Sequence, residues 1–272
     1  MAKALFIHST GTFSSMWRPY LDAIARDATP LTPDNLGYPP NPPLPRGAAH
    51  TTRDDAQHLL GQLAVHGATE EPVDLYGHSY GGLVALRLVE LLGLLEHGGR
   101  VRSLWLFEPV LFGSLPTLRP GSEAAERTLA MVESGGFFDD ELGGTEVWLE
   151  RFIDYWNRPG SWRRMPDAMR DPIRAVGWKM YQEVRQGFFD LTATADRPIP
   201  TLPAHTTILM GERSPLEARA MCELLAEHSP DARLVDLPGV GHMAPLTHPE
   251  PVRQALLAHA ERLSAGAVGL SR

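Results

Sequence analysis

The stretch Leu75–Gly82, with the sequence LYGHSYGG, decides the fold of this chain. In it Gly77 and Gly81 stand two residues before and two residues after Ser79, in the spacing Gly-x-Ser-x-Gly. Glycines at these places allow a strand and the following helix to approach closely, while the serine occupies a strained, exposed turn. An apolar run precedes the turn, and the helical pattern Leu83–Leu95 follows it. We therefore expect a nucleophilic serine at the carboxyl end of a sheet, rather than a serine that only caps a glycine turn.

Short apolar runs alternate with helical patterns along most of the chain. The expected strands are Ala4–His8, Pro30–Thr32, Val73–Tyr76, Val101–Glu108, Thr206–Met210 and Ala232–Leu237. Besides the helix after Ser79, the expected helices of this part are Trp17–Ala28, Thr51–His66, Glu217–His228 and Pro249–Leu263, with a frayed tail beyond Ala265. Such alternation is typical of a parallel sheet covered by helices on both faces. We expect an α/β fold with a mostly parallel sheet of about six strands.

The alternation stops between residues 111 and 203. Three helical segments, Ser122–Ser134, Thr145–Asn157 and Pro166–Gly187, follow one another there without convincing strands, and they are rich in aromatic residues. An all-helical segment between two strands of such a sheet is a candidate cap. We therefore expect residues 1–110 and 204–272 to form the α/β core and residues 111–203 to form a helical cap. Most of its aromatic residues would fill its own small core, and some would face a cavity.

The composition limits the classes of function. The chain has 272 residues, of which 43% are hydrophobic and 21% charged, as in an ordinary globular protein. The net charge of −8 argues against nucleic acid and anionic membranes as partners. The single cysteine, Cys222, excludes an internal disulfide and a cysteine-based metal site, and we interpret it as a core residue. With no visible signal peptide or membrane-length apolar run, we expect a cytoplasmic protein that acts on a small molecule, in an oligomeric state the sequence leaves open.

In combination, these features resemble the α/β-hydrolase fold superfamily from end to end. The matching parts are a loop that begins at His8 after the first strand, the serine turn, the helical insert, and Gly241-His242 after the last strand. The order serine, acid, histidine along the chain is that of this family. The resemblance implies a serine-nucleophile, esterase-like branch of the family. The start of the first strand at Ala4 implies that the usual amino-terminal hairpin is missing.

The serine needs a base, because its hydroxyl is a poor nucleophile at neutral pH. Among eleven histidines, His242 is the candidate, since its glycine-flanked loop after the final strand lies above the sheet edge in the family. His8 and His78 flank the turn regions, and we expect them to pack or support the site. His248 stands at a helix start and is expected to be structural.

The acid is less defined than the serine and the base. Relatives often carry an aspartate three residues beyond a glycine after the penultimate strand, but counting from Gly211 this place holds Ser214. Glu108 is the favoured replacement, because it closes an apolar strand, some branches of the family carry their acid there, and a buried carboxylate needs a partner. Glu212 is the alternative acid. Glu108 could also serve only to anchor the entry to the cap.

Acyl chemistry also needs hydrogen-bond donors for a developing oxyanion. The backbone N–H of Tyr80, directly after the serine, is the first candidate. The resemblance places the second donor at the backbone N–H of Thr10, in a loop where Ser9 replaces the glycine that usually follows the histidine.

The expected activity is hydrolysis of a carboxylic ester or lactone of a small to medium apolar substrate through an acyl-enzyme, with no metal and no cofactor. A carbon–carbon bond hydrolase, a thioesterase and an acyltransferase could use the same residues. The haloalkane dehalogenase and epoxide hydrolase relatives use an aspartate in place of Ser79, which disfavours their chemistry. A non-catalytic binding protein on the same fold is the alternative from another class, suggested by Ser214 and Ser9.

Overall fold

The computed structural model describes residues 2–25, 27–68, 71–93, 101–190 and 199–269. Its centre is a six-stranded sheet in the order β2-β1-β3-β4-β5-β6, in which every neighbouring pair is parallel. The strands are β1 (Ala2–Ile7), β2 (Ala28–Leu31), β3 (Val73–His78), β4 (Val101–Phe107), β5 (His205–Gly211) and β6 (Arg233–Leu237). This arrangement confirms the predicted α/β fold and its sheet of about six parallel strands.

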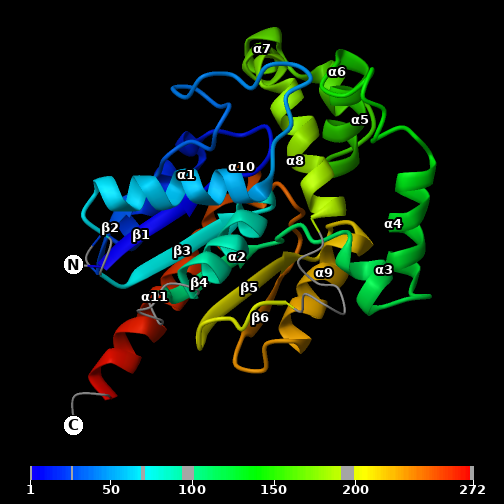
Figure 1. Ribbon diagram of the computed structural model, residues 1–272. Coiled ribbons are helices and arrows are strands. Elements are labelled where there is room, and N and C mark those ends of the chain that lie inside the picture. The colour runs from blue at the N-terminus through cyan, green and yellow to red at the C-terminus, as the bar shows by residue number, and fades with distance from the viewer. Residues whose placement is uncertain (1, 26, 69–70, 94–100, 191–198, 270–272) are drawn as a thin grey trace.

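Helices cover both faces of the sheet (Figure 1). The elements outside the long connection from β4 to β5 are the 3₁₀ helix η1 (Ser14–Ala23) and the α-helices α1 (Thr52–Val65), α2 (Tyr80–Gly93), α9 (Leu216–Glu227), α10 (Ala244–Thr247) and α11 (Pro249–Gly269). Alternate strand residues point to opposite faces. Leu5 and Ile7 of β1 join the core beneath α1, α2 and α9, whereas Ala4 and Phe6 join the core beneath η1 and α11.

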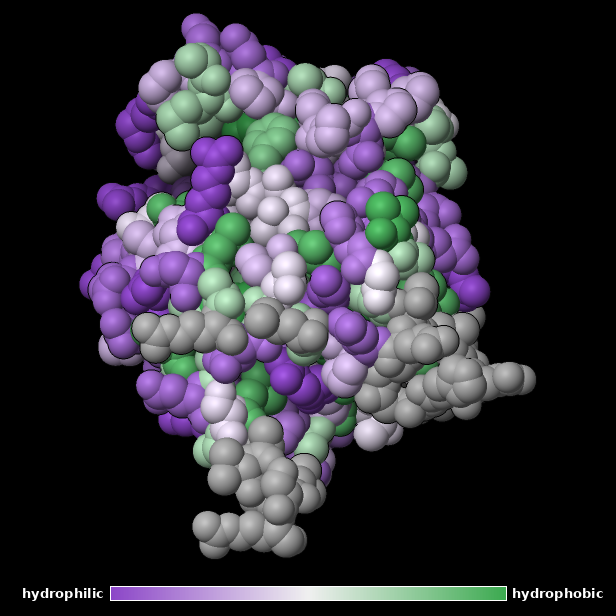
Figure 2. All heavy atoms as spheres, turned by 90° about the vertical axis from the view of Figure 1, so that its left-hand side faces the viewer, coloured by the Kyte–Doolittle hydropathy of each residue, from purple (hydrophilic) through white to green (hydrophobic). Residues whose placement is uncertain are grey.

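In the described part of the connection between β4 and β5 lie six helices, and we call them the insertion. They are α3 (Ser114–Leu118), α4 (Glu123–Glu133), α5 (Glu146–Trp156), α6 (Ser161–Arg164), α7 (Asp167–Ala175) and α8 (Gly177–Phe189). In Figure 1 they lie beside the sheet, from α7 at the top down the right-hand side to α3 near α9. Figure 2 shows a face on which hydrophilic residues dominate and hydrophobic residues reach the surface in small separate patches. Within the described part of the chain, no helix could reach across a membrane.

Two predicted helices were wrong in form. The expected helix Trp17–Ala28 is the 3₁₀ helix η1, and Ala28 already belongs to β2. Pro19 lies inside η1 and has no N–H for an α-helical hydrogen bond. The expected helix Pro166–Gly187 is divided into α7 and α8 by Val176, and at Gly177, the first residue of α8, a Cβ atom would collide with the carbonyl oxygen of Gly144.

The ends of two other predicted helices also differ from the structure. The last helix continues to Gly269 instead of ending at Leu263. The expected fraying beyond Ala265 is therefore wrong for the backbone as far as Gly269. The predicted end of the helix after the serine, at Leu95, lies outside the described residues.

Candidate active site

Ser79 lies at the sharp turn between β3 and α2. Its φ of 55° is in the left-handed region that non-glycine residues rarely adopt. A Cβ on Gly77 would lie 2.6 Å from the carbonyl oxygen of Gly81, and a Cβ on Gly81 would collide with the carbonyl oxygen of Ile7. The two glycines therefore permit the close approach that the turn requires. The N–H of Ser79 donates to the carbonyl of Phe107 at 2.9 Å, which ties the turn to β4.

Ser79, His242 and Glu108 meet at the carboxyl ends of the strands. The Ser79 Oγ lies 3.0 Å from His242 Nε2, and His242 Nδ1 lies 2.6 Å from Glu108 Oε2. All three residues are buried, with at most 4% of the surface of any of them exposed. Three segments far apart in the sequence thus form one continuous hydrogen-bonded chain from a hydroxyl to a carboxylate.

The second oxygen of Glu108 is held from β5 and the loop after it. Oε1 accepts hydrogen bonds from the Gly211 N–H at 2.6 Å and the Ser214 hydroxyl at 2.5 Å. Glu108 directly follows β4 and has a φ of 43°, so its backbone, like that of Ser79, lies in the strained left-handed region. Ser214, which stands where relatives often carry an aspartate, here donates to the carboxylate that contacts the imidazole. Glu212 is exposed instead, and its carboxylate accepts from the N–H of Gly239 at 2.7 Å.

A tryptophan of the insertion covers the imidazole. Trp156, at the end of α5, stacks on His242 with ring centroids 3.6 Å apart and an angle of 20° between the planes. Sequence reasoning placed Trp156 among the aromatic residues of the insertion but did not single it out. Its only sequence signal was its place in that aromatic-rich segment, because the contact joins positions 86 residues apart in the chain.

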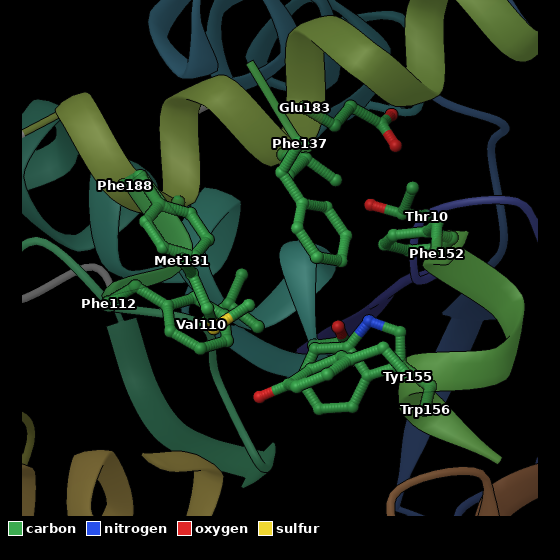
Figure 3. Close-up of a pocket in the computed structure, with 13 residues that line it drawn as sticks. Thr10, Val110, Phe112, Met131, Phe137, Phe152, Tyr155, Trp156, Glu183 and Phe188 are labelled. Atoms are coloured by element: carbon green, nitrogen blue, oxygen red, sulfur yellow. The ribbon is translucent and has the colours of Figure 1, made fainter. Parts of the chain in front are cut away.

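Two cavities meet at Ser79. The inner cavity, of about 20 Å³, lies beneath the insertion, and the aromatic side chains around it point into a common space in Figure 3. The outer cavity, of about 570 Å³, lies between η1, α7 and α10. Thr10, Ser79, Phe152 and Trp156 line both cavities, whereas His242 lines only the outer one.

Residues 4–255 match the sequence profile of the alpha/beta hydrolase family. The chain belongs to this family. The match spans the sheet, the insertion and all three residues of the hydrogen-bonded chain, and it confirms the resemblance that the serine turn indicated. No curated protein matches the chain.

Solved structures with the same fold include proteins of different activities. A thermophilic esterase from Thermogutta terrifontis has 20% identity and a TM-score of 0.64, over 97% of this chain and 90% of its own. A haloalkane dehalogenase loop variant from Bradyrhizobium elkanii has 18% identity and a TM-score of 0.68, over 98% and 91%. A thioesterase of the prodiginine pathway from Streptomyces coelicolor has 16% identity and a TM-score of 0.65, over 96% and 85%. At these identities the similarity shows the fold alone.

Two further histidines of this alpha/beta hydrolase are buried around the site. His78 Nε2 lies 2.9 Å from the carbonyl oxygen of His242 and holds the loop of that residue. Burial and the neighbouring His242 hold the pKa of His78 well below its usual range. His8 Nε2 accepts the Asn35 N–H at 3.0 Å, and burial also lowers the pKa of His8. Both side chains support the site as neutral groups. His248 is exposed and lies 2.8 Å from the Thr247 hydroxyl.

The segments that carry the two candidate oxyanion donors, the backbone N–H groups of Thr10 and Tyr80, are each held by a hydrogen bond of a tyrosine hydroxyl. Thr10 lines both cavities beside Ser79, and the N–H of the next residue, Gly11, donates to the Tyr38 hydroxyl at 2.9 Å. Tyr80 follows Ser79 directly, and its hydroxyl donates to Asp55 Oδ2 at 2.7 Å.

Behind these tyrosines lies a cluster of buried charges, which we call the Lys179 cluster. Lys179 Nζ donates to Asp55 Oδ2 and to Glu183 Oε1, each at 2.7 Å, and all three side chains are at most 1% exposed. Burial opposes ionisation of Asp55, but the Lys179 ammonium and His50 hold the pKa of this carboxyl well below its usual range. The Tyr38 hydroxyl donates to Glu183 Oε2 at 2.9 Å. The cluster joins α1 of the core to α8 of the insertion, and sequence reasoning did not find it.

Within the described ranges, no group of His, Cys, Asp and Glu side chains is arranged to hold a metal ion. Cys222 is buried in α9, where burial raises the pKa of its thiol well above the usual value. It therefore packs as a core residue and stays protonated.

Proposed function

We propose that this protein is a serine hydrolase that cleaves a carboxylic ester or lactone of a small to medium apolar substrate through an acyl-enzyme. The observation that carries the proposal is the continuous hydrogen-bonded chain from Ser79 through His242 to Glu108. An imidazole in this position can take the serine proton as the hydroxyl attacks a carbonyl. A buried carboxylate on the far nitrogen fixes the tautomer and stabilises the imidazolium that forms.

In the proposed acylation, Ser79 Oγ bonds to the carbonyl carbon and its proton passes to His242 Nε2. The backbone N–H groups of Tyr80 and Thr10 donate to the oxyanion, and each such donor typically contributes about 3 kcal/mol to the transition state. His242 then protonates the leaving alkoxide as the carbon–oxygen bond breaks. In deacylation, water attacks the carbonyl of the acyl-enzyme while His242 takes a proton from the water, and His242 then returns this proton to Ser79 Oγ as the carboxylic acid leaves.

The insertion is proposed to act as the cap of this site. It supplies Phe152 and Trp156 at the junction of the two cavities, and both side chains are buried. Excluding water around the carbonyl would strengthen the hydrogen bonds of the oxyanion. A serine at position 79 also favours acyl over alkyl transfer, because an alkyl–serine ether would not be hydrolysed readily.

The proposal is tested by labelling with a fluorophosphonate probe at neutral pH. Wild-type protein should be labelled on Ser79 and should hydrolyse p-nitrophenyl esters, whereas Ser79→Ala should be unlabelled and lose about 10⁶-fold in kcat. Absence of both labelling and turnover would favour a non-catalytic binding protein on the same fold.

A substrate panel separates the reactions that share these residues. If the protein is an ester hydrolase, kcat/KM should be higher for p-nitrophenyl esters than for acyl thioesters or for a diketone cleaved at a carbon–carbon bond. Hydrolysis of the ester should also be faster than transfer of its acyl group to an added alcohol. A preference for one of these other substrates would replace ester hydrolysis by the corresponding activity.

A further inference from the structure

We infer that the substrate of this hydrolase carries a small acyl group and a large apolar alcohol group. This inference rests on the proposed ester hydrolysis and deepens it, since it assigns each half of the ester to one of the two cavities at Ser79. The assignment depends on which cavity His242 faces and on the size of each cavity.

The position of His242 determines which cavity takes the alcohol. When the carbon–oxygen bond of the ester breaks, the proton that His242 received from Ser79 must reach the leaving alkoxide. The alkoxide must therefore lie on the side of the imidazole. His242 lines the outer cavity but not the inner one. The alcohol half consequently lies in the outer cavity, and the acyl half points into the inner one.

The inner cavity limits the acyl half. Its volume of about 20 Å³ is room for roughly one water molecule, which is the size of a methyl group. Aromatic rings packed on one another form much of its wall: Phe188 stacks on Phe112 at 4.3 Å, and Phe137 packs edge-on against Tyr155 at 6.0 Å. An acetyl group fits this space. A longer acyl chain would need these rings to move apart.

The outer cavity suits a much larger group. Its volume of about 570 Å³ lies within the range of about 300 to 1,000 Å³ that is usual for small-molecule pockets. Met165, Met169 and Ile173 line it from the insertion, and Met243 and Leu246 line it from the core. Methionine side chains adapt to irregular apolar shapes, so the cavity can accept aromatic as well as aliphatic alcohols.

A pair of isomeric esters tests the assignment. In 2-phenylethyl acetate the large group is on the alcohol side, whereas in methyl 3-phenylpropanoate the same atoms are present with the ester group reversed. We expect kcat/KM to be at least about 100-fold higher for 2-phenylethyl acetate, because one methylene that does not fit a pocket already costs about 10-fold or more.

Two variants locate the effect. Phe137→Ala removes a half-buried side chain from the wall of the inner cavity and should raise kcat/KM for methyl 3-phenylpropanoate by about 10-fold or more. The ratio of kcat/KM for 2-phenylethyl acetate to kcat/KM for methyl 3-phenylpropanoate should therefore decrease. Phe189→Ala makes the same deletion at a residue that is 47% exposed and lines neither cavity, and it should leave the ratio unchanged.

The outcomes separate this inference from the function on which it rests. The inference would be overturned if wild-type kcat/KM were similar for the two isomers or higher for methyl 3-phenylpropanoate. It would also be overturned if p-nitrophenyl acetate were hydrolysed but neither isomer was. In each case ester hydrolysis would still stand. The wild-type ratio decides even if Phe137→Ala does not fold. Failure of all three esters together with an unlabelled Ser79 would overturn both.

Discussion

At the level of single residues, Glu108 uses its two oxygens for different contacts. Oε2 contacts His242 Nδ1, and Oε1 accepts from Gly211 and Ser214. The carboxylate is thereby fixed between β4 and β5 before any substrate binds. A carboxylate held in this way can orient an imidazole without a side-chain rearrangement during catalysis.

We predict that Glu108→Gln lowers kcat by about 10⁴-fold with little change in KM, because an amide N–H facing His242 Nδ1 would stabilise the wrong tautomer. Glu212→Gln, at the exposed neighbouring carboxylate, is the matched control and should retain full activity. Steady-state kinetics on p-nitrophenyl acetate, with circular dichroism to verify folding, provide the measurement. An active Glu108→Gln variant together with an inactive Glu212→Gln variant would reverse the assignment of the acid.

The sequence predicted Ser79, His242 and Glu108, because each follows a strand in a recognisable local pattern, and parallel strands bring their carboxyl ends to one edge. It could not predict Trp156 or the Lys179 cluster in the same way. The contacts of Trp156 with His242 and of Lys179 with Asp55 join helices of the insertion to the core across long stretches of sequence, and only the pair Lys179–Glu183 has the local spacing of a helix turn. Ser214 is intermediate: the sequence located it at the usual place of the acid but not its hydrogen bond to Glu108.

At the level of elements, the turn between β3 and α2 depends on two close backbone contacts. Gly81 lies against the carbonyls of Ile7 and His8 in β1 and its loop, and Gly82 lies against Pro109 after β4. The start of α2 is thus held against the neighbouring segments on both sides of β3. This packing keeps Ser79 in its strained conformation, since a local relaxation of φ would move the helix into its neighbours.

We predict that Gly81→Ala lowers the free energy of unfolding by about 1–3 kcal/mol and abolishes activity, because its methyl group would force α2 away from β1. Gly61→Ala is the control, since Gly61 lies inside α1 with no atom within 4 Å of an added Cβ. It should raise the free energy of unfolding by about 0.5–1 kcal/mol. Urea denaturation measures both values, and an active Gly81→Ala of unchanged stability would contradict the packing argument.

The sequence predicted most elements of the core because their strands are short apolar runs and their helices are periodic. It was less successful where backbone contacts decide the form. Pro19 lacks the N–H that an α-helix would need there, so its residue type could have indicated that this segment is not a regular α-helix. The helix is interrupted at Val176, beside the close contact of Gly177 with Gly144, which only the folded chain brings together.

At the level of the whole molecule, several buried histidines influence the pH dependence of stability. Burial, with the nearby charge of Arg262, lowers the pKa of His259 to about 3, and burial lowers the pKa values of His8 and His78 as well. As the pH falls below about 6.5, the unfolded chain takes up protons at these residues, whereas the folded chain takes them up only at lower pH. The free energy of unfolding should therefore decrease as the pH falls from 6.5 towards 3.

His259→Gln tests this dependence, because glutamine takes up no proton in the unfolded chain but keeps a polar group beside Thr207. The slope of the unfolding free energy between pH 4 and pH 6 should become shallower by up to about 1.4 kcal/mol per pH unit. Urea denaturation at several pH values gives the slope. An unchanged slope would mean that His259 binds its proton equally in both states.

The Lys179 cluster also bears on how a substrate reaches Ser79. Separating α8 from α1 would break the buried ion pair between Lys179 and Asp55, whereas Lys179 would keep Glu183 on its own helix, and breaking a buried ion pair costs several kcal/mol. By contrast, the ion pairs that join α7 to α5 run from Arg170 and Arg174 to Glu146, whose side chain is half exposed, and exposed pairs of this kind contribute little to stability. We therefore expect the entrance to Ser79 to widen by displacement of α7, while α8 stays in place against α1 during turnover.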